Sequence, residues 1–222
     1  MRSLLVTSAG SGVGQAVFNA LKYSPHTYRL VVLNSHPLSS IFQHADAAYL
    51  SPETAQQEAF ASRLTTIITQ EKPDLILAGR DEELPILAKL RSEIEALGSR
   101  VPGPNTELSL SCTDKYLTWK QLGHLLPVTE TAFTSTEIEA LLKRWGFPVL
   151  VKPRRGFASR GVLVVHTRAL LEAFLAEAQE PYIVQPYLSQ TTHEPHSTNW
   201  PEQSGQIVIG ARGQILGVFA SQ

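Results

Sequence analysis

Short apolar runs alternate with segments of helical periodicity over the first hundred residues. The runs predict buried strands, and the segments between them carry apolar residues three and four positions apart, as amphipathic helices do. The predicted strands are Leu4–Val6, Leu30–Leu33, Ala48–Leu50 and Leu75–Ala78, and helices are expected to begin near Gly12, at Ser51–Glu53 and at Leu84. Strands that are apolar throughout, with helices between them, indicate a parallel sheet covered on both faces.

The pattern changes after the turn-rich joint Val101–Pro104. The chain is expected to be helical from Leu108 to Leu126, and a mixed order of strands and helices follows. The predicted strands are Thr131–Phe133, Val149–Val151, Val162–Val165 and Tyr182–Val184, the helices Ile138–Trp145 and Leu170–Ala178, and the final hairpin Ile207–Ile209 with Gln214–Phe219. Residues 189–205 are polar and are expected to form a mobile loop. The shift in pattern predicts two domains, residues 1–104 and 105–222.

The composition places the chain among ordinary globular proteins. Of the 222 residues, 43% are hydrophobic and 18% are charged, which excludes disordered, collagenous and coiled-coil chains. The single cysteine, Cys112, excludes an internal disulfide and fits a reducing compartment. No apolar run approaches the ~18 residues of a membrane span. We therefore expect a cytoplasmic protein with no membrane partner.

The charge distribution is uneven although the net charge is only −1, with 19 Lys and Arg against 20 Asp and Glu. Residues 143–168 contain no acidic residue and carry seven basic ones: Lys143, Arg144, Lys152, Arg154, Arg155, Arg160 and Arg168. Such a segment suggests a polyanionic ligand. The near-neutral total and the small number of interleaved aromatic residues argue against a nucleic acid.

The glycines near the start have two interpretations. Gly10, Gly12 and Gly14 follow a predicted strand and open a helix, as the glycines of a dinucleotide-binding turn do. The pattern lacks that motif's last glycine, since Gln15 stands there, and its ribose-binding acid, since Asn34 ends the next strand. Close packing of helix on strand also demands small residues here. Both interpretations remain open, and a nicotinamide-dependent enzyme is the less favoured one.

The basic segment has phosphate-binding chemistry. Lys152 ends a buried strand, so its ammonium group is held at a fixed point. The turn that follows contains Gly156, Ser159 and Gly161, and its backbone N–H groups can close over an anion. Arginine side chains add paired donors suited to phosphate oxygens. The alternative is a solvated basic hairpin without a ligand.

Three stretches in the second half carry a resemblance. Thr113–Lys115 followed by Leu126–Thr129 is similar to a D-K … P-x-T segment, Phe147–Val162 to F-P-x-x-x-K-P … G-x-x-S-x-G-V, and Tyr182–Leu188 to an adenine-binding hinge. Together they resemble the ATP-grasp superfamily, in the branch of the carbamoyl-phosphate synthetase large chains and biotin carboxylase. Upstream, Ala45–Leu50 and Ala78–Pro85 are similar to the pre-ATP-grasp domain of the same ligases.

The resemblance implies a Rossmann-like pre-ATP-grasp domain over residues 1–104, followed by the N-terminal portion of an ATP-grasp domain over 105–222. Lys115 and Lys152 would contact ATP phosphates, the backbone from Arg155 to Gly161 would close over them with Ser159 as a hydroxyl donor, and Gln185, Tyr187 and Leu188 would hold adenine. The implied ATP-binding set is Lys115, Lys152, Arg154, Arg155, Gly156, Ser159, Gly161, Gln185, Tyr187, Leu188 and Glu194, the last for ribose.

The resemblance also implies a reaction in which MgATP activates a small carboxylate as an acyl phosphate for attack by an amine-like nucleophile. Relatives carry their Mg²⁺ carboxylates after the final hairpin, so we expect no protein ligand to the metal in this chain, and Mg²⁺ to arrive with ATP. Catalytic residues remain unknown. A missing C-terminal segment, a second chain or a homodimer would supply the rest. The alternative is a non-catalytic nucleotide-binding module.

Three acidic residues, Asp81, Glu82 and Glu83, follow a predicted strand. They are expected either to face substrate or to form the charged first turn of a helix, where acidic side chains complement the helix dipole.

Overall fold

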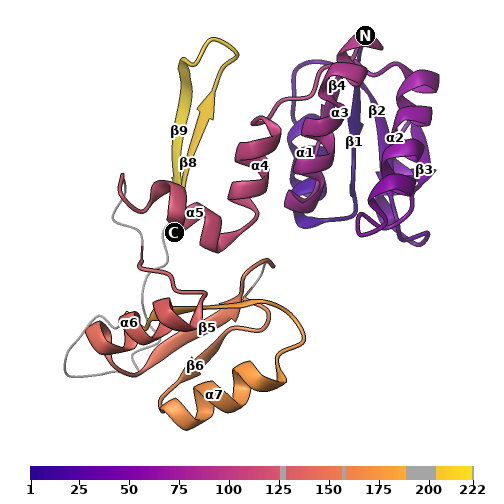
Figure 1. Cartoon of the computed structure of the whole chain (residues 1–222). Helices are drawn as coiled ribbons and strands as arrows, with labels where there is room; N and C mark the ends of the chain where they lie inside the picture. Colours follow the sequence, from indigo (N-terminus) through magenta and orange to yellow (C-terminus); the bar gives the residue numbers. More distant parts are fainter. Residues whose placement is uncertain (126–128, 157–158, 189–203, 222) are drawn as a thin grey trace.

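The computed structural model describes residues 1–125, 129–156, 159–188 and 204–221. These residues form a four-stranded sheet, a three-stranded sheet and a two-stranded hairpin. Figure 1 shows the first two sheets in separate parts of the molecule, here called the first lobe and the second lobe, with the hairpin outside both.

The first lobe is a parallel sheet of order β3-β2-β1-β4. Its elements are β1 (Arg2–Val6), α1 (Gly12–Lys22), β2 (Tyr28–Asn34), β3 (Ala47–Leu50), α2 (Gln57–Glu71), β4 (Leu75–Leu77) and α3 (Leu84–Ala96), with short 3-10 helices η1 (Ser40–His44) and η2 (Asp81–Glu83). The predicted α/β architecture is confirmed.

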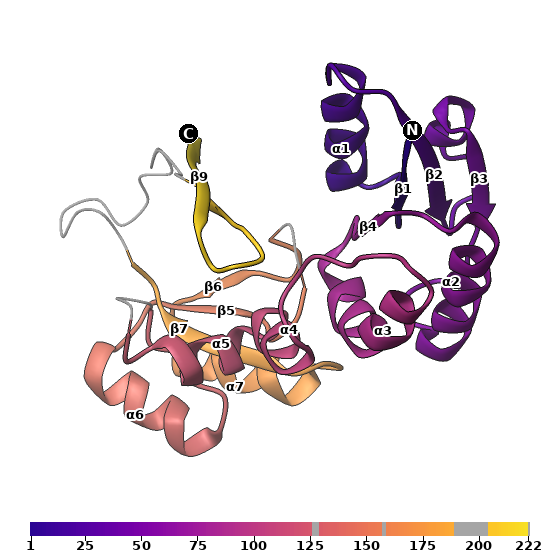
Figure 2. The ribbon, with the colours of Figure 1, turned by 90° about the horizontal axis from the view of Figure 1, so that it is seen from above.

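Both faces of this sheet are covered because side chains alternate along each strand. Leu5 and Leu33 point to one face and pack in a cluster with residues of α2 and α3. Leu30 and Val32 point to the other face and pack with residues of α1. Figure 2 shows α1 on one side of the strands and α2 and α3 on the other.

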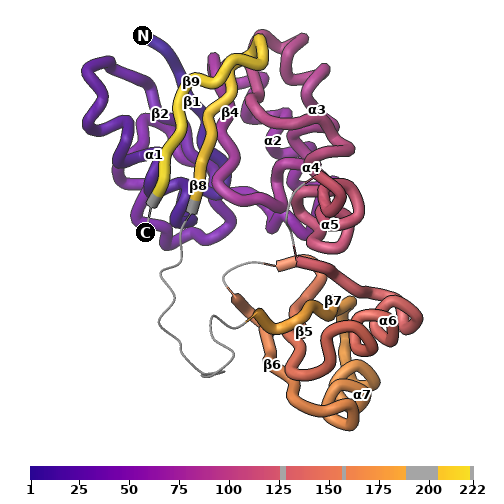
Figure 3. The backbone as a smooth tube through the Cα atoms, turned by 90° about the vertical axis from the view of Figure 1, so that its left-hand side faces the viewer, coloured from indigo at the N-terminus to yellow at the C-terminus, as the bar shows by residue number. Residues whose placement is uncertain are grey.

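Two predicted helix boundaries were wrong. α2 begins at Gln57, not at Ser51–Glu53, because the Ser51 N–H still donates to the Asn34 carbonyl at 3.1 Å and keeps the chain on the sheet. The expected helix over Leu108–Leu126 is two helices, α4 (Thr106–Cys112) and α5 (Lys115–Leu122), which lie between the lobes (Figure 3). Asp114 separates them, since its carboxylate accepts from the first backbone N–H groups of α5.

The second lobe is an antiparallel sheet of order β6-β5-β7. Its elements are α6 (Ser135–Trp145), β5 (Val149–Pro153), β6 (Leu163–Val165), α7 (Arg168–Glu177) and β7 (Tyr182–Pro186). Val149, Val151 and Val184 pack against apolar residues of α6 and α7. The predicted strand Thr131–Phe133 is reduced to a single bridge between Ala132 and Val184.

The predicted hairpin is confirmed, with strands β8 (Ser204–Ile209) and β9 (Ile215–Ser221). Its large apolar side chains are exposed on both faces: Ile207, Val208, Ile209, Ile215, Leu216, Val218 and Phe219. The loop expected at 189–205 falls largely outside the described residues. Within the described part of the chain, no helix is long and apolar enough to cross a membrane.

Candidate functional site

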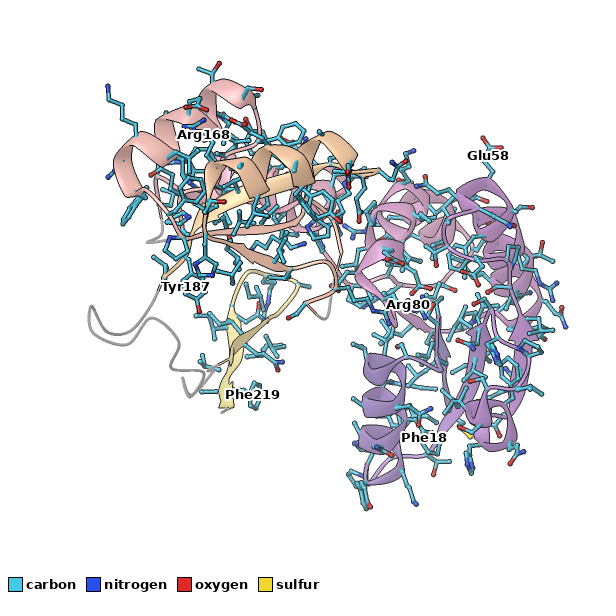
Figure 4. All side chains as sticks on the ribbon, turned by 90° about the horizontal axis from the view of Figure 1, so that it is seen from below. Phe18, Glu58, Arg80, Arg168, Tyr187 and Phe219 are labelled. Atoms are coloured by element: carbon cyan, nitrogen blue, oxygen red, sulfur yellow. The ribbon has the colours of Figure 1, made fainter. Side chains whose placement is uncertain are left out.

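The alternation of β5 places Lys152 on the face of the second-lobe sheet opposite its helices. Val149 and Val151 are buried against α6 and α7, so Leu150 and Lys152 point the other way. Leu150 pairs with Gln185 and Lys152 with Ile183, which puts Gln185 on the same face as Lys152. Figure 4 shows Tyr187, just beyond β7, on the opposite side of the lobe from Arg168 of α7.

Lys115, the first residue of α5, is held beside the loop that follows β5. Its Nζ donates to the carbonyls of Pro153 and Gly156 at 3.1 Å each, and its backbone N–H donates to the Arg154 carbonyl at 3.1 Å. Two predicted phosphate-binding segments, far apart in sequence, therefore meet at one place.

The two lysines form a centre of unneutralised positive charge. Burial lowers the pKa of Lys152, and the nearby charge of Lys115 lowers it further. Burial also lowers the pKa of Lys115, against the opposing influence of Asp114 and Glu180. Neither ammonium group forms a salt bridge within the described residues. Two ammonium groups in this situation favour an anion between them.

Three described residues of the loop after β5 have a positive φ angle. Gly156 and Gly161 have φ of +133° and +69°, and Ser159 has φ of +55°. At Gly161 a Cβ atom would lie 2.8 Å from Pro153 Cγ, so this position requires glycine for space as well as conformation. Gly156 and Ser159 are exposed and so accessible to a ligand.

Asp114 anchors both arginines that follow β5. The Nε of Arg154 donates to both of its carboxylate oxygens at 2.8 Å, and the Nε of Arg155 lies 3.5 Å from one of them. The Arg154 guanidinium also lies over the rings of Tyr116 and Phe133, 5.1 and 4.6 Å from their centroids. Arg154 is therefore engaged inside the protein, whereas the side chain of Arg155 is 65% exposed.

The electrostatics of Asp114 follow from these contacts. Burial alone would raise the pKa of its carboxyl group, but the Arg154 hydrogen bonds, the Leu117 N–H and the charge of Arg155 hold that pKa below its ordinary value. The sequence analysis missed the role of Asp114. The sequence signal for its capping role is an acidic residue directly before a helix. The pairing with Arg154 becomes visible only in the structure.

The basic segment does not stay together in space. Arg144 and Arg168 point to carboxylates of other elements, with Arg144 Nη1 at 3.4 Å from Glu130 and Arg168 Nη1 at 2.5 Å from Glu139. Together with Arg154 and Arg155, four of the seven basic residues are paired with acids. Beside the loop after β5, the ammonium groups of Lys115 and Lys152 and the exposed guanidinium of Arg155 remain available to a ligand.

The predicted adenine-binding residues lie at the other end of β5. Gln185 is buried, and its Nε2 donates to Thr131 Oγ1 at 2.7 Å. The Tyr187 N–H donates to the Pro148 carbonyl at 3.4 Å, and Leu188 is exposed. Pro148 and Lys152 are four positions apart along the strand, about 13 Å at ~3.3 Å per residue. Glu194, predicted to bind ribose, lies outside the described residues.

The glycine loop of the first lobe serves packing. A Cβ atom at Gly14 would lie 2.4 Å from the Ala9 carbonyl oxygen, so only glycine lets α1 approach β1. The side chain of Asn34, at the end of β2, accepts from the Gly10 N–H at 3.2 Å and donates to the His36 carbonyl at 3.3 Å. These contacts favour the packing interpretation over a dinucleotide site.

Asp81, Glu82 and Glu83 form the acidic turn of η2, in agreement with one of the two expectations for the triplet. Within this turn Glu83 is completely buried, at the ends of β1 and β4. Its carboxylate accepts from Thr7 Oγ1 at 2.6 Å, Ser8 Oγ at 2.7 Å and the Gly79 N–H at 3.1 Å. Burial raises the pKa of Glu83, and these hydrogen bonds partly offset the effect. Glu83 thus joins the two loops at the sheet's switch point, while Asp81 and Glu82 remain exposed.

Comparison with known proteins finds similarity over most of the chain. Residues 4–101 match the family described as PylC-like, N-terminal domain. Over 171 residues the chain is 25% identical to the carbamoyl phosphate synthase large chain of Gemmatimonas aurantiaca, a match covering 72% of this chain and 15% of that protein. The C-terminal section of the Aquifex aeolicus large chain is 26% identical over 174 residues, covering 74% of this chain and 31% of that protein. The chain is therefore similar in sequence to carbamoyl phosphate synthase large chains over 72–74% of its length.

Solved structures extend the likeness of the fold to both lobes. The N5-carboxyaminoimidazole ribonucleotide synthetase of Thermotoga maritima superposes with a TM-score of 0.64 at 17% identity, over 97% of this chain and 51% of that one. An ADP complex of a synthetase of the same name gives a TM-score of 0.70 at 16% identity, over 98% and 52%. At these identities the likeness shows the fold. The chain spans about half the length of these structures and a smaller share of the large chains it matches.

Within the described residues, no group of three or more His, Cys, Asp or Glu side chains is placed to hold a metal ion.

Proposed function

We propose that the chain supplies the ATP-binding elements of a carboxylate-activating ligase of the ATP-grasp type. The observation that carries this proposal is the pair Lys115 and Lys152, two adjacent ammonium groups without a salt-bridge partner in the described residues, beside a loop with backbone suited to an anion. Bound ATP would supply the phosphoryl group that activates a carboxylate.

In this proposal the nucleotide lies along β5 on the open face of the second lobe. Lys152 and Lys115 neutralise the phosphates at one end, and the backbone of the loop from Arg155 to Gly161 donates to them. Ser159 adds a hydroxyl donor. At the other end, Gln185, Tyr187 and Leu188 border adenine, and Glu194 contacts ribose.

The roles of the two arginines differ in this proposal. Arg154 is a positioning residue, because its guanidinium is already bound to Asp114 and covered by two aromatic rings. Arg155 is exposed and has a longer contact of 3.5 Å to Asp114, so its guanidinium is available to a phosphate oxygen. We assign no residue of the chain as a catalytic acid, base or nucleophile.

The remaining parts of the proposal concern substrate and partners. The substrate is a small carboxylate, and Mg²⁺ enters bound to ATP. A further segment of the protein, a second chain or a second copy in a homodimer completes the site and covers the apolar hairpin, whose exposed faces favour such a contact. A cytoplasmic location belongs to the proposal because the lone cysteine fits a reducing compartment.

Calorimetric titration with MgATP tests the proposal. Lys152→Ala removes one charged hydrogen-bond donor, and such contacts are worth about 1.5–3 kcal/mol, so affinity should fall roughly 10- to 150-fold. Lys143→Ala is the matched control, because Lys143 belongs to the same basic segment but lies exposed on α6, and it should bind ATP as the parent chain does. Equal affinity in the two variants, or binding of NADP(H) without ATP, would refute the proposal.

A steady-state ATPase measurement with added carboxylates separates a ligase from a non-catalytic module. Carboxylate-dependent release of phosphate supports the ligase, whereas ATP binding without turnover in the complete assembly supports the module.

A further inference from the structure

A cavity of about 430 Å³ lies where the two lobes meet. The first lobe contributes the start of α2 and the junction of η2 with α3, and the second half contributes α4, Lys115 and the Arg155–Gly156 loop. This volume is in the range of sites for small organic ligands. Because Lys115 and Arg155 belong both to the cavity and to the proposed phosphate site, the cavity adjoins that site.

Charges of both signs line the cavity. Lys115 and Arg155 stand on the phosphate side, and Lys89 of α3 adds a third basic group. Asp81 and Glu82 line it from the first lobe. A ligand that carries only negative charge would satisfy the basic groups and leave the two carboxylates unpaired.

Asp81 and Glu82 are not required elsewhere in the structure. Both side chains are exposed, and neither forms a hydrogen bond or ion pair with another described residue. Their neighbour Glu83 is the opposite case, since it is buried and accepts hydrogen bonds from two hydroxyls and two backbone N–H groups. The triplet therefore divides into one structural acid and two acids that face the cavity.

We propose that this cavity holds the carboxylate substrate of the ligase, and that the substrate is an amino acid or a similarly small molecule with a protonated amine. The inference rests on the function proposed above. The substrate carboxylate lies toward Lys115 and Arg155, next to the nucleotide phosphates. Its ammonium group lies toward Asp81 and Glu82, and its apolar part contacts Ile86 and Leu110, which also line the cavity.

Cys112 provides a probe of occupancy that does not depend on activity. It is the single cysteine of the chain, it is exposed, and it lines the same cavity. The rate of its alkylation by iodoacetamide, an uncharged reagent, can be measured by intact mass while ligands are added. At about ten times the dissociation constant, mass action leaves roughly a tenth of the sites empty, so alkylation should slow about 10-fold.

The probes are the proteinogenic L-amino acids, each compared with its analogue lacking the amine, such as alanine with propionate and glutamate with glutarate. We expect at least one amino acid to protect Cys112 and its amine-free analogue to protect it far less. In the double variant Asp81→Asn, Glu82→Gln, the dissociation constant of the protecting amino acid should rise by a factor of about 10 or more. Glu95→Gln, an exposed position of α3 outside the cavity, is the control and should retain protection.

Two results would overturn the inference: equal protection by the amine-free analogues, or no protection by any amino acid at millimolar concentration. An ATP titration of the same preparation separates this failure from that of the proposed function. ATP binding without protection by any amino acid would refute the amino-acid substrate and leave the proposed ATP site standing. Protection without ATP binding would refute the proposed ligase function, and with it the assignment of the cavity as the substrate site of a ligase.

Discussion

Asp114→Asn tests the contact that links the phosphate loop to α5. The wild-type carboxylate accepts two hydrogen bonds at 2.8 Å from Arg154 Nε and one at 3.1 Å from each of the Tyr116 and Leu117 N–H groups. Asparagine is as good as aspartate at a helix N-cap, so its amide oxygen can retain the bonds to α5. The same oxygen also accepts from Arg154 Nε, but the NH₂ group that replaces the second oxygen faces this Nε–H donor against donor, and the negative charge is lost.

The expected cost follows from burial. The Asp114 side chain is 1% exposed and that of Arg154 is 22% exposed, so the substitution leaves a largely buried guanidinium without its counter-ion. Removal of one partner from a buried pair costs about 3–5 kcal/mol, and the partial exposure of Arg154 places this case near the lower end, at about 3 kcal/mol. With a urea m-value of ~3 kcal/mol/M, the unfolding midpoint should fall by roughly 1 M.

Tryptophan fluorescence is a suitable assay because residues 1–104 contain no tryptophan, so the signal comes from the second half of the chain. The loss should shrink when Arg154→Met is combined with Asp114→Asn, since the double variant leaves no unpaired charge and keeps an aliphatic contact with the rings. A fall in the free energy of unfolding below about 0.5 kcal/mol for Asp114→Asn would show that the ion pair does not anchor the loop, because that is the range of ordinary surface substitutions.

The pH dependence provides an independent check of the same contact. Because the folded-state pKa of Asp114 lies below its ordinary value of 3.8, the stability that its carboxylate contributes is fully present above that pH. The difference between parent and Asn variant should therefore be constant near neutrality and shrink as the pH falls below 3.8. A difference that is independent of pH over this range contradicts the assigned pKa direction.

Three further predictions concern single contacts. Gly14→Ala should lower the free energy of unfolding, followed by circular dichroism, by about 2 kcal/mol, because the added Cβ would lie 2.4 Å from the Ala9 carbonyl oxygen. Gly12→Ala, whose added Cβ has no neighbour within 4 Å, should leave the free energy of unfolding unchanged. Equal effects of the two substitutions would refute the packing role. Since burial raises the pKa of Glu83, the stability of the parent relative to Glu83→Gln should decline as the pH rises above 4.5, and a constant difference would contradict this. Arg168→Ala removes only two exposed ion pairs, with Glu139 and Glu172, so its urea midpoint should match the parent's.

Much of the fold follows from local patterns in the sequence. The apolar run Leu30–Leu33 lies in β2, and the run Leu75–Ala78 contains β4. Such runs predict parallel strands because a strand covered on both faces needs apolar side chains at successive positions. The hairpin β8–β9 likewise lies where the two short apolar runs and the turn residues Arg212–Gly213 between them predict it. The domain boundary at residue 104 stays a prediction, although the Arg91 side chain binds the carbonyls of Gly103 and Pro104 at that point.

The errors concern contacts between residues far apart in sequence. The split between α4 and α5 depends on Asp114, whose full role requires an arginine forty positions away. The basic segment looks like one patch in the sequence, yet Arg144 and Arg168 form ion pairs with Glu130 and Glu139. The periodicity of the sequence does not predict these pairs, because they depend on how separate elements pack. The position of Lys152 was predictable because strand alternation alone fixes the face on which it lies.

Hydrogen exchange with and without MgATP tests the central claim most directly, because it locates the nucleotide along the chain. The account predicts slowed exchange in the Lys152–Gly156 and Ser159–Val165 segments and in Tyr182–Leu188, with no change in the Gly10–Gly14 loop. Protection confined to Gly10–Gly14, or no protection in any segment at saturating MgATP, would contradict it.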